Sequence, residues 1–248
     1  MDRLEVLKDW PEPMWRNRIE RQRAAYAKYF RLSLIAIMTL LVSSCSSILD
    51  LAPERGMRFT LSRATGLEKC GERCKVIVVA SGLIENSSHK KFEHFLKSSF
   101  NGKPKGLTIL MESKGGYVVA AAKLGKLLRE NGAIVIVAKP GAMNRTNLKL
   151  KWHSAQCASA CVYAFMGGQI RIVPAGSSLV LHRSFAEISG IGGREYNNQV
   201  LRQYIDNYAK EMGVDAEVID FAERLQPDQY FVIEPKLIEK WNLAQQGL

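Results

Sequence analysis

The sequence predicts an α/β fold with a mostly parallel sheet. Three apolar runs of strand length, at residues 75–80, 107–111 and 133–138, lack polar alternation, which is typical of strands that are buried on both faces. Segments of helical length follow the first two runs, at residues 89–99 and 117–131, and glycines stand in the intervening turns. Strands that alternate with helices across short loops favour parallel strands joined by helical crossovers.

Shorter elements are predicted in the C-terminal half. Two strands, at residues 170–173 and 178–181, flank a Pro-Ala-Gly turn. A glycine-rich loop then precedes a long amphipathic helix at residues 195–212, which a glycine ends. Two more helices follow, at residues 215–225 and 234–241. The sequence contains no internal repeat and no low-complexity tract.

The basic charge of the chain has no pattern typical of nucleic-acid binding. The 248 residues carry a formal charge of +11; eight Lys/Arg and five Asp/Glu give residues 1–44 a share of +3, which leaves +8 for residues 45–248. The later basic residues are scattered, apart from a loop with Arg145, Lys149 and Lys151. A moderately basic surface beside anionic lipid or an envelope polymer explains this charge at least as well as nucleic acid does, so no nucleic-acid partner is expected.

The chain divides into three parts. Residues 1–44 form a basic, Arg-rich segment that ends in an apolar run at residues 32–42, about half the length that a bilayer-spanning helix needs. Such a run fits the apolar core of a secretory signal. Residues 45–74 are interpreted as a tether and lead-in, and residues 75–248 as the folded domain.

The apolar run ends in Val42-Ser43-Ser44-Cys45, which resembles a bacterial lipoprotein signal. The resemblance implies lipidation of Cys45 and a membrane-anchored domain on the periplasmic side of the bacterial cell envelope. Two alternatives remain: an uncleaved membrane anchor, or a short core helix that happens to end in Ser-Ser-Cys. The leader is long for a signal, so translation could begin at Met14.

Three features are suited to acyl-transfer chemistry. A serine hydroxyl is a weak nucleophile until a base takes its proton and a donor stabilises the oxyanion. Ser159 begins a helix, where free N–H groups can act as such donors. Gly115-Gly116 forms a strand-to-helix turn whose backbone can approach a carbonyl closely, and His182 ends a predicted strand. Each also has a simpler structural interpretation, as a helix start, a tight turn or a half-buried histidine.

Taken in order, these motifs resemble the Clp-type serine peptidases and the wider Clp/crotonase (ClpP-like) fold. The resemblance rests on Ser113-Lys114-Gly115-Gly116, Cys157-Ala158-Ser159-Ala160 and Leu181-His182-Arg183, and on Asp228-Gln229-Tyr230-Phe231 after the last long helices. It covers roughly residues 75–245 and implies a repeated β-β-α spiral fold with a C-terminal helical handle region. The implied site consists of the triad Ser159, His182 and Asp228, with Gly115, Gly116 and Ala160 around the oxyanion.

The chain departs from this family's pattern in three places. Lys114 stands where the family has proline, Cys157 and Cys161 replace small residues beside the serine, and residues 139–156 lengthen the preceding segment. In these three places the chain resembles a secreted Clp-like branch of the fold more than a cytosolic degradative enzyme. Asp215 and Asp220 compete with Asp228 for the third place in the triad.

Four cysteines follow Cys45, in two pairs with the same spacing: Cys70 with Cys74, and Cys157 with Cys161. In an oxidising compartment an even count favours disulfides. The bonds could join each pair internally or cross between the pairs. A four-thiolate zinc site is the alternative in a reducing compartment, and a cysteine nucleophile is a remoter one.

The sequence therefore predicts an envelope-anchored serine peptidase or hydrolase that acts on a peptide or protein and needs neither metal nor organic cofactor. The resemblance implies self-association through the helix at 195–212. No ATPase partner is expected, because the envelope lacks ATP. Two alternatives stay open: a catalytically silent binding or assembly module, and a crotonase-like enzyme that acts on acyl thioesters.

Overall fold

A computed structural model describes residues 56–62, 77–100, 104–141, 152–188, 193–196 and 198–246. All of them lie within one compact unit, Glu54–Leu248. The predicted lipidation site Cys45, the first cysteine pair and the basic loop all lie outside the described residues. Within the described ranges, no helix has the length and apolar character needed to cross a membrane.

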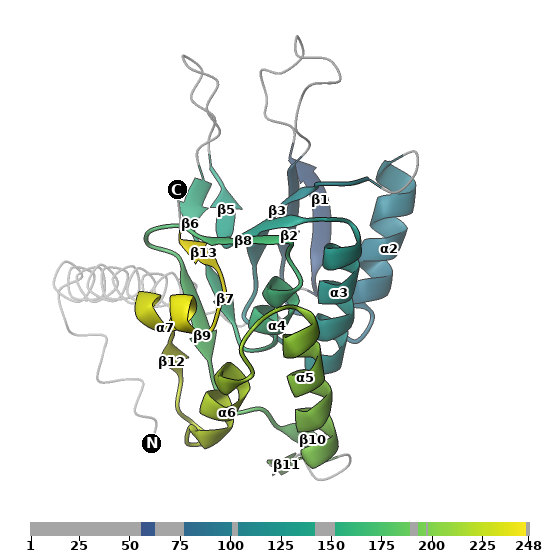
Figure 1. The fold of residues 1–248 in the computed structure, drawn as a ribbon. Helices are drawn as coiled ribbons and strands as arrows, with labels where there is room; N and C mark the ends of the chain where they lie inside the picture. Colours follow the sequence, from purple (N-terminus) through teal and green to yellow (C-terminus); the bar gives the residue numbers. More distant parts are fainter. Residues whose placement is uncertain are drawn as a thin grey trace, which may run out of the picture. The chain divides into compact units, whose positions relative to one another are not determined.

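A six-stranded sheet forms the centre of this unit (Figure 1). Its strands, in spatial order, are β1 (Arg58–Ser62), β2 (Ile77–Ser81), β3 (Thr108–Glu112), β4 (Ile134–Ile136), β8 (Ile170–Val173) and β13 (Gln245–Gln246). All neighbours from β2 to β13 are parallel, and β1 pairs with β2 in the antiparallel sense. The predicted mixed α/β fold with mostly parallel strands is confirmed.

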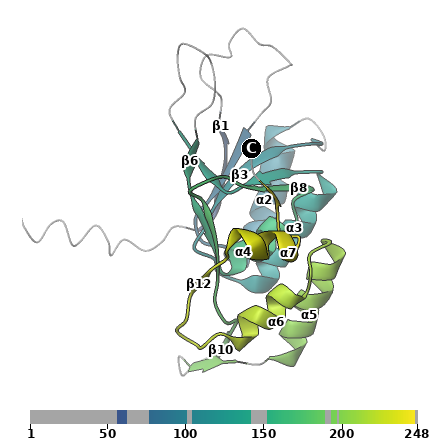
Figure 2. The same cartoon turned by 60° about the vertical axis from the view of Figure 1, so that its left-hand side comes forward.

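Alternate residues of the central strands face two different hydrophobic clusters. Ile109 and Met111 of β3 belong to the main core, whereas Leu110 faces a smaller cluster on the other side. Helices α2 (Ser88–Ser99) and α3 (Val118–Glu130) pack on the main-core face, as Figures 1 and 2 show from two directions. Burial on both faces explains why β2, β3 and β4 read as continuous apolar runs.

A second, smaller sheet contains β12 (Phe231–Val232), β9 (Ser178–Leu181) and β7 (Gln156–Ala158), in that order. Two isolated parallel bridges continue the pairing beyond these strands: Ser113 pairs with Cys157 of β7, and Ile84 pairs with Gly116. Thus β2 and β3 each run into a short bridged segment and then into a helix. This succession matches the β-β-α repeat that the sequence resemblance implied.

The C-terminal region contains α5 (Gln199–Glu211), α6 (Glu217–Arg224) and α7 (Pro235–Lys240), with α4 (Ala160–Met166) beside α3 in the core. Helix α5 begins later than predicted, because Asn198 caps it by accepting a hydrogen bond from the Leu201 N–H at 2.9 Å. The residues before it instead form β11 (Gly193–Glu195), which pairs with β10 (Ala186–Ile188).

Two predicted boundaries differ from the structure. Residues 58–62, assigned to the lead-in, form β1, which pairs with β2 and has no other partner among the described strands. The predicted strand at 133–138 divides instead at Val137 into β4 and β5 (Ala138–Pro140), and β5 pairs with β6 (Trp152–Ser154). Neither change was visible in the hydrophobic pattern, because both depend on partner strands distant in sequence.

A buried arginine joins the last strands to the helices. Arg171 of β8 is 3% exposed. Its guanidinium donates to five main-chain carbonyl oxygens, those of Met166, Gly168, Met212, Asn242 and Leu243. Burial, followed by repulsion from Arg129, lowers the pKa of Arg171 to about 10, so the side chain remains protonated at neutral pH. The charge is thereby stabilised by peptide dipoles from three segments of the chain.

Candidate active site

Ser159 occupies a strained turn between strand β7 and helix α4. Its backbone angles are φ 55° and ψ −127°, and only one other described residue besides glycine, Asn242, has a positive φ. L-residues pay a steric cost in this region, so they persist there only where the surroundings hold them. A sharp, strained strand-to-helix turn is also the geometry that exposes the nucleophilic serine in many hydrolases.

Main-chain hydrogen bonds on both sides hold this turn. The Ser159 N–H donates to the Val180 carbonyl of β9 at 2.8 Å, and the Ala158 N–H donates to the Ser113 carbonyl at 2.9 Å. Because β7 and β9 are parallel, with Ala158 opposite Val180, Ser159 lies beside the end of β9. His182 follows this end directly, so the register brings the predicted nucleophile and the predicted base to the same edge.

Gly115 packs directly against the serine. A Cβ atom at this position would lie 2.6 Å from the Ser159 Cβ and 3.0 Å from its Oγ, at a φ of +109°. The Gly115 N–H donates to the Ser113 Oγ at 3.0 Å, a side-chain turn typical of serine two residues before the donor. Ser113 was not among the predicted site residues, although its place before Gly-Gly is a turn signal.

Gly116 fixes the other side of the turn. The Ile84 N–H donates to the Gly115 carbonyl at 2.7 Å, and the Tyr117 N–H donates to the Ile84 carbonyl at 2.8 Å. Among the described residues, the N–H groups of Gly116 and Ala160 donate to no protein acceptor. Both therefore remain available as oxyanion donors, the role predicted for them.

His182 presents a defined tautomer. Its Nδ1 lies 2.8 Å from the Arg183 carbonyl oxygen, and a carbonyl can only accept, so Nδ1 carries the proton. The neutral ring then keeps Nε2 as its acceptor, which is the state a general base requires. The exposed Tyr230 ring lies against the imidazole, with centroids 5.5 Å apart.

The described structure gives His182 no carboxylate partner. Asp228 is exposed in the segment between α6 and β12, and no hydrogen bond joins it to His182 within the described residues. Asp215 instead accepts from the Glu217 N–H, and Asp220 pairs with Arg202. A catalytic role for Asp228 therefore stays a prediction.

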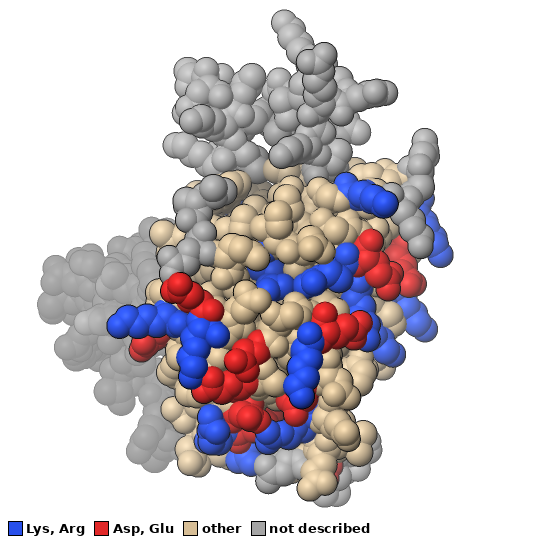
Figure 3. Space-filling model, viewed as in Figure 1, with Lys and Arg blue, Asp and Glu red and all other residues tan. Residues whose placement is uncertain are grey.

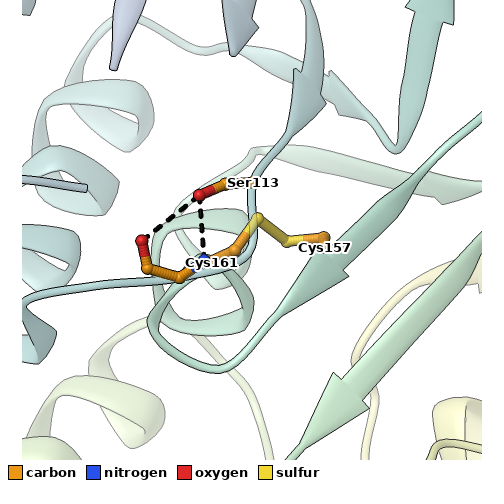
Figure 4. The surroundings of a disulfide bond; sticks show 4 residues. Ser113, Cys157 and Cys161 are labelled. Carbon is orange, nitrogen blue, oxygen red and sulfur yellow. Dashed lines mark hydrogen bonds between the residues drawn. A yellow bond between two sulfur atoms is a disulfide. The ribbon is translucent and has the colours of Figure 1, made fainter. Parts of the chain in front are cut away.

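A disulfide between Cys157 and Cys161 spans the serine turn (Figure 4). Cys157 is the middle residue of β7 and Cys161 lies in the first turn of α4. Both side chains are fully buried. Figure 4 shows the bond beside Ser113, whose main chain bridges to Cys157. Of the pairings left open by the sequence, the structure shows this local one, which removes two of the four thiolates that a zinc site would need.

We expect the double variant C157A/C161A to remain folded but to react more slowly at Ser159. The disulfide closes a short loop, so its loss should cost about 2 kcal/mol of stability in the chain-entropy account. A nucleophile displaced by about 1 Å loses up to roughly a hundredfold in rate. Urea unfolding and the rate of fluorophosphonate labelling measure the two effects. An unchanged labelling rate would show that the strained turn holds itself without the bond.

A cavity of about 310 Å³ opens beside the glycine turn. Its lining comes from the ends of three neighbouring strands and includes Arg58, Gly82, Glu112, Ser113 and Lys114. Glu112 pairs with Lys139 at 2.6 Å. The cavity thus shares Ser113 with the site.

No family model and no curated protein matches the sequence. Similar solved structures include two mutants of the 1510-N membrane-bound stomatin-specific protease, at 17% identity alone and 18% in complex with a substrate peptide. Both have a TM-score of 0.47, and both matches cover 67% of this chain. The match covers 75% of the first protease chain and 71% of the peptide-bound one. A ClpP1 mutant from Listeria monocytogenes has 16% identity, a TM-score of 0.45, and coverage of 69% of this chain and 90% of its own.

Proposed function

We propose that the chain is a serine peptidase or peptidase-like hydrolase in which Ser159 attacks and His182 acts as the base. The observation that carries the proposal is the strained backbone of Ser159, with φ at 55° between a strand and a helix. A serine that merely began a helix would adopt an ordinary extended conformation. Here the strain is held by two strands, a glycine contact and a disulfide.

The proposed reaction uses groups whose protonation the structure supports. As the Ser159 Oγ bonds to the substrate carbonyl carbon, its proton passes to His182 Nε2, and the carbonyl electrons move to the oxygen. The Gly116 and Ala160 N–H groups stabilise this oxyanion. The tetrahedral adduct then expels the amine, which takes the proton from the imidazolium. Water, activated by the same imidazole, releases the acyl group and restores the serine.

Exposed apolar side chains beside the site favour a peptide substrate with apolar residues. Tyr230 is 72% exposed next to His182, and Tyr117 is 58% exposed directly after the Gly-Gly turn. Val119 and Val232 extend these two groups and are also exposed. An extended peptide that passed between the two groups would cover them, which is a reason for such side chains to stay uncovered.

The finer parts of the proposal concern location and assembly. We propose anchoring at the periplasmic face of the envelope through Cys45 and self-association of the chain; Val200, 81% exposed on α5, supports a helix contact. Figure 3 shows Lys/Arg and Asp/Glu interspersed over α5, α6 and α7. Lys126, Arg202 and Lys240 each pair with an acid there. This mixed charge supports a protein or peptide partner over nucleic acid.

Fluorophosphonate labelling of the purified full-length chain tests the proposal. The Ser159 Oγ–P bond forms as the P–F bond breaks, and we expect labelling to disappear in Ser159→Ala and to fall to a small residual rate in His182→Ala. Ser98→Ala, an exposed helix serine, is the matched control and should label like wild type. Folded wild type that does not label would overturn the hydrolase and favour the binding module. Labelling that persisted in Ser159→Ala would show that another residue is the nucleophile.

A further inference from the structure

Glu223 of α6 is a buried carboxylate that the proposed mechanism does not use. Its side chain is 10% exposed, and burial raises its pKa above the ordinary glutamate value. Hydrogen bonds from the Ser184 hydroxyl and from the Ser184 main-chain N–H oppose this rise, as does the charge of Arg183. Its partners thus lie in the segment that directly follows His182.

The hydrogen bonds on this segment form a continuous path. His182 Nδ1–H donates to the Arg183 carbonyl at 2.8 Å, and the Ser184 N–H, which belongs to the same peptide unit, donates to Glu223. The path therefore runs from the imidazole through one peptide group to a carboxylate. A negative charge at the N–H side polarises the peptide and makes its carbonyl a stronger acceptor.

A second branch ties Glu223 to the helix that begins after the nucleophile. The Ser184 Oγ lies 3.3 Å from the hydroxyl of Tyr163 on α4. Tyr163 is buried, which raises its pKa to about 12 and keeps it protonated. Through Ser184, the carboxylate contacts both the base-bearing segment and the nucleophile-bearing helix.

We propose that Glu223 is the acidic positioning residue of the site, acting on His182 through the Arg183–Ser184 peptide. The inference rests on the proposed function and assigns to a relayed carboxylate the orienting role that a triad aspartate has when it contacts the imidazole directly. Asp228, exposed and without a bond to His182 among the described residues, lacks this connection.

The energetics separate this role from a merely structural one. Because the folded-state pKa of Glu223 is raised, its ionisation lowers stability as the pH rises from the unfolded value through the folded value. Arg183 and Arg202 face the carboxylate and favour its charge, but desolvation outweighs them. At neutral pH, Glu223→Gln should therefore be at least as stable as wild type. A stable Glu223→Gln variant that labels more slowly would therefore show that the carboxylate serves the reaction and not the stability of the fold.

Labelling kinetics with a fluorophosphonate provide the test in the full-length chain. We expect Glu223→Ala to lower the first-order labelling constant roughly tenfold to a hundredfold, with little change in the half-saturating probe concentration. Glu223→Gln, which keeps an oxygen acceptor for the Ser184 N–H, should lie between Ala and wild type. Glu217→Gln, on the same helix but paired with Lys240, is the control and should label like wild type.

The His182→Ala background identifies the route of action. If Glu223 acts through the imidazole, Glu223→Ala should not slow the residual labelling any further, because residues that act as one unit are non-additive. A further loss of the same size would overturn the proposal. A loss confined to Asp228→Ala, with Glu223→Ala unchanged, would also overturn it and would restore the aspartate.

A readout independent of activity distinguishes failure of this inference from failure of the hydrolase. NMR of the ring nitrogens should show His182 protonated at Nδ1 in wild type and an increased Nε2–H tautomer in Glu223→Ala. If wild type fails to label but the tautomer shifts, the hydrolase is wrong and the relay stands. If the tautomer does not respond to Glu223→Ala, the relay is wrong whether or not the chain labels.

Discussion

Replacing Gly116 by alanine is expected to destabilise the domain by about 3–4 kcal/mol and to abolish labelling of Ser159. The added Cβ would lie 2.1 Å from the Ile84 carbonyl oxygen, at a φ of +136° that L-residues rarely adopt. Neither partner can yield easily, because both are main chain and are joined by the bonds that fix the turn. Urea unfolding measures the loss of stability, and fluorophosphonate labelling measures the loss of reactivity.

Gly213→Ala separates the two causes of this effect. Gly213 also has a positive φ, +68°, but an added Cβ there would meet no atom within 4 Å. Only the conformational cost remains, about 1–2 kcal/mol, and labelling should be unaffected. Equal losses of stability in the two variants would show that the contact with Ile84 is relieved by a small shift of the turn.

Replacing Arg171 by methionine is expected to cost about 3–5 kcal/mol of unfolding free energy, among the largest effects of a single substitution. Methionine fills similar space but donates no hydrogen bond, so the Asn242 and Leu243 carbonyls lose their 2.8 Å and 2.7 Å bonds from the guanidinium. A buried acceptor left unsatisfied costs about 1–3 kcal/mol. Urea unfolding of the purified variant gives the value directly.

Arg129→Met is the matched comparison. Arg129 donates to the carbonyls of Met166, Gly168 and Met212, which Arg171 also contacts. Either arginine can therefore satisfy them when the other is lost, and we expect Arg129→Met to cost less than Arg171→Met. The double variant should lose more than the sum of the two. Strict additivity would contradict the shared set of carbonyls.

The parts of the fold that the sequence predicted are those whose signal is local. Strands 170–173 and 178–181 were predicted with the bounds that β8 and β9 have, because a turn and β-branched residues mark both ends. Helices α2 and α3 were predicted to within a residue at each end. Strands β1 and β7 were missed, since neither has a continuous apolar run and each is defined by its partner strand rather than by its own pattern.

The candidate site shows the same division. The Gly-Gly turn and the Ser159 turn could be predicted, because a backbone that closely approaches another segment of the same chain requires glycine or small residues. The Cys157–Cys161 pairing could not be chosen, since it depends on the distorted turn between them. Glu223 gave no signal at all: in the sequence it is one acid among several in an amphipathic helix, and its burial appears only after the segment following β9 packs on α6.

Arg129 and Arg171, which share carbonyl partners at the end of α4, affect how the stability of the domain depends on ionic strength. All the hydrogen-bond partners of Arg171 and Arg129 in the described chain are neutral carbonyls. Salt therefore has no attraction between opposite charges to screen at this place. After burial, repulsion from Arg129 is the next cause that lowers the pKa of Arg171, and salt weakens this repulsion. Unlike an ion-pair network, this cluster should hold the domain together at least as well in concentrated salt as in dilute buffer.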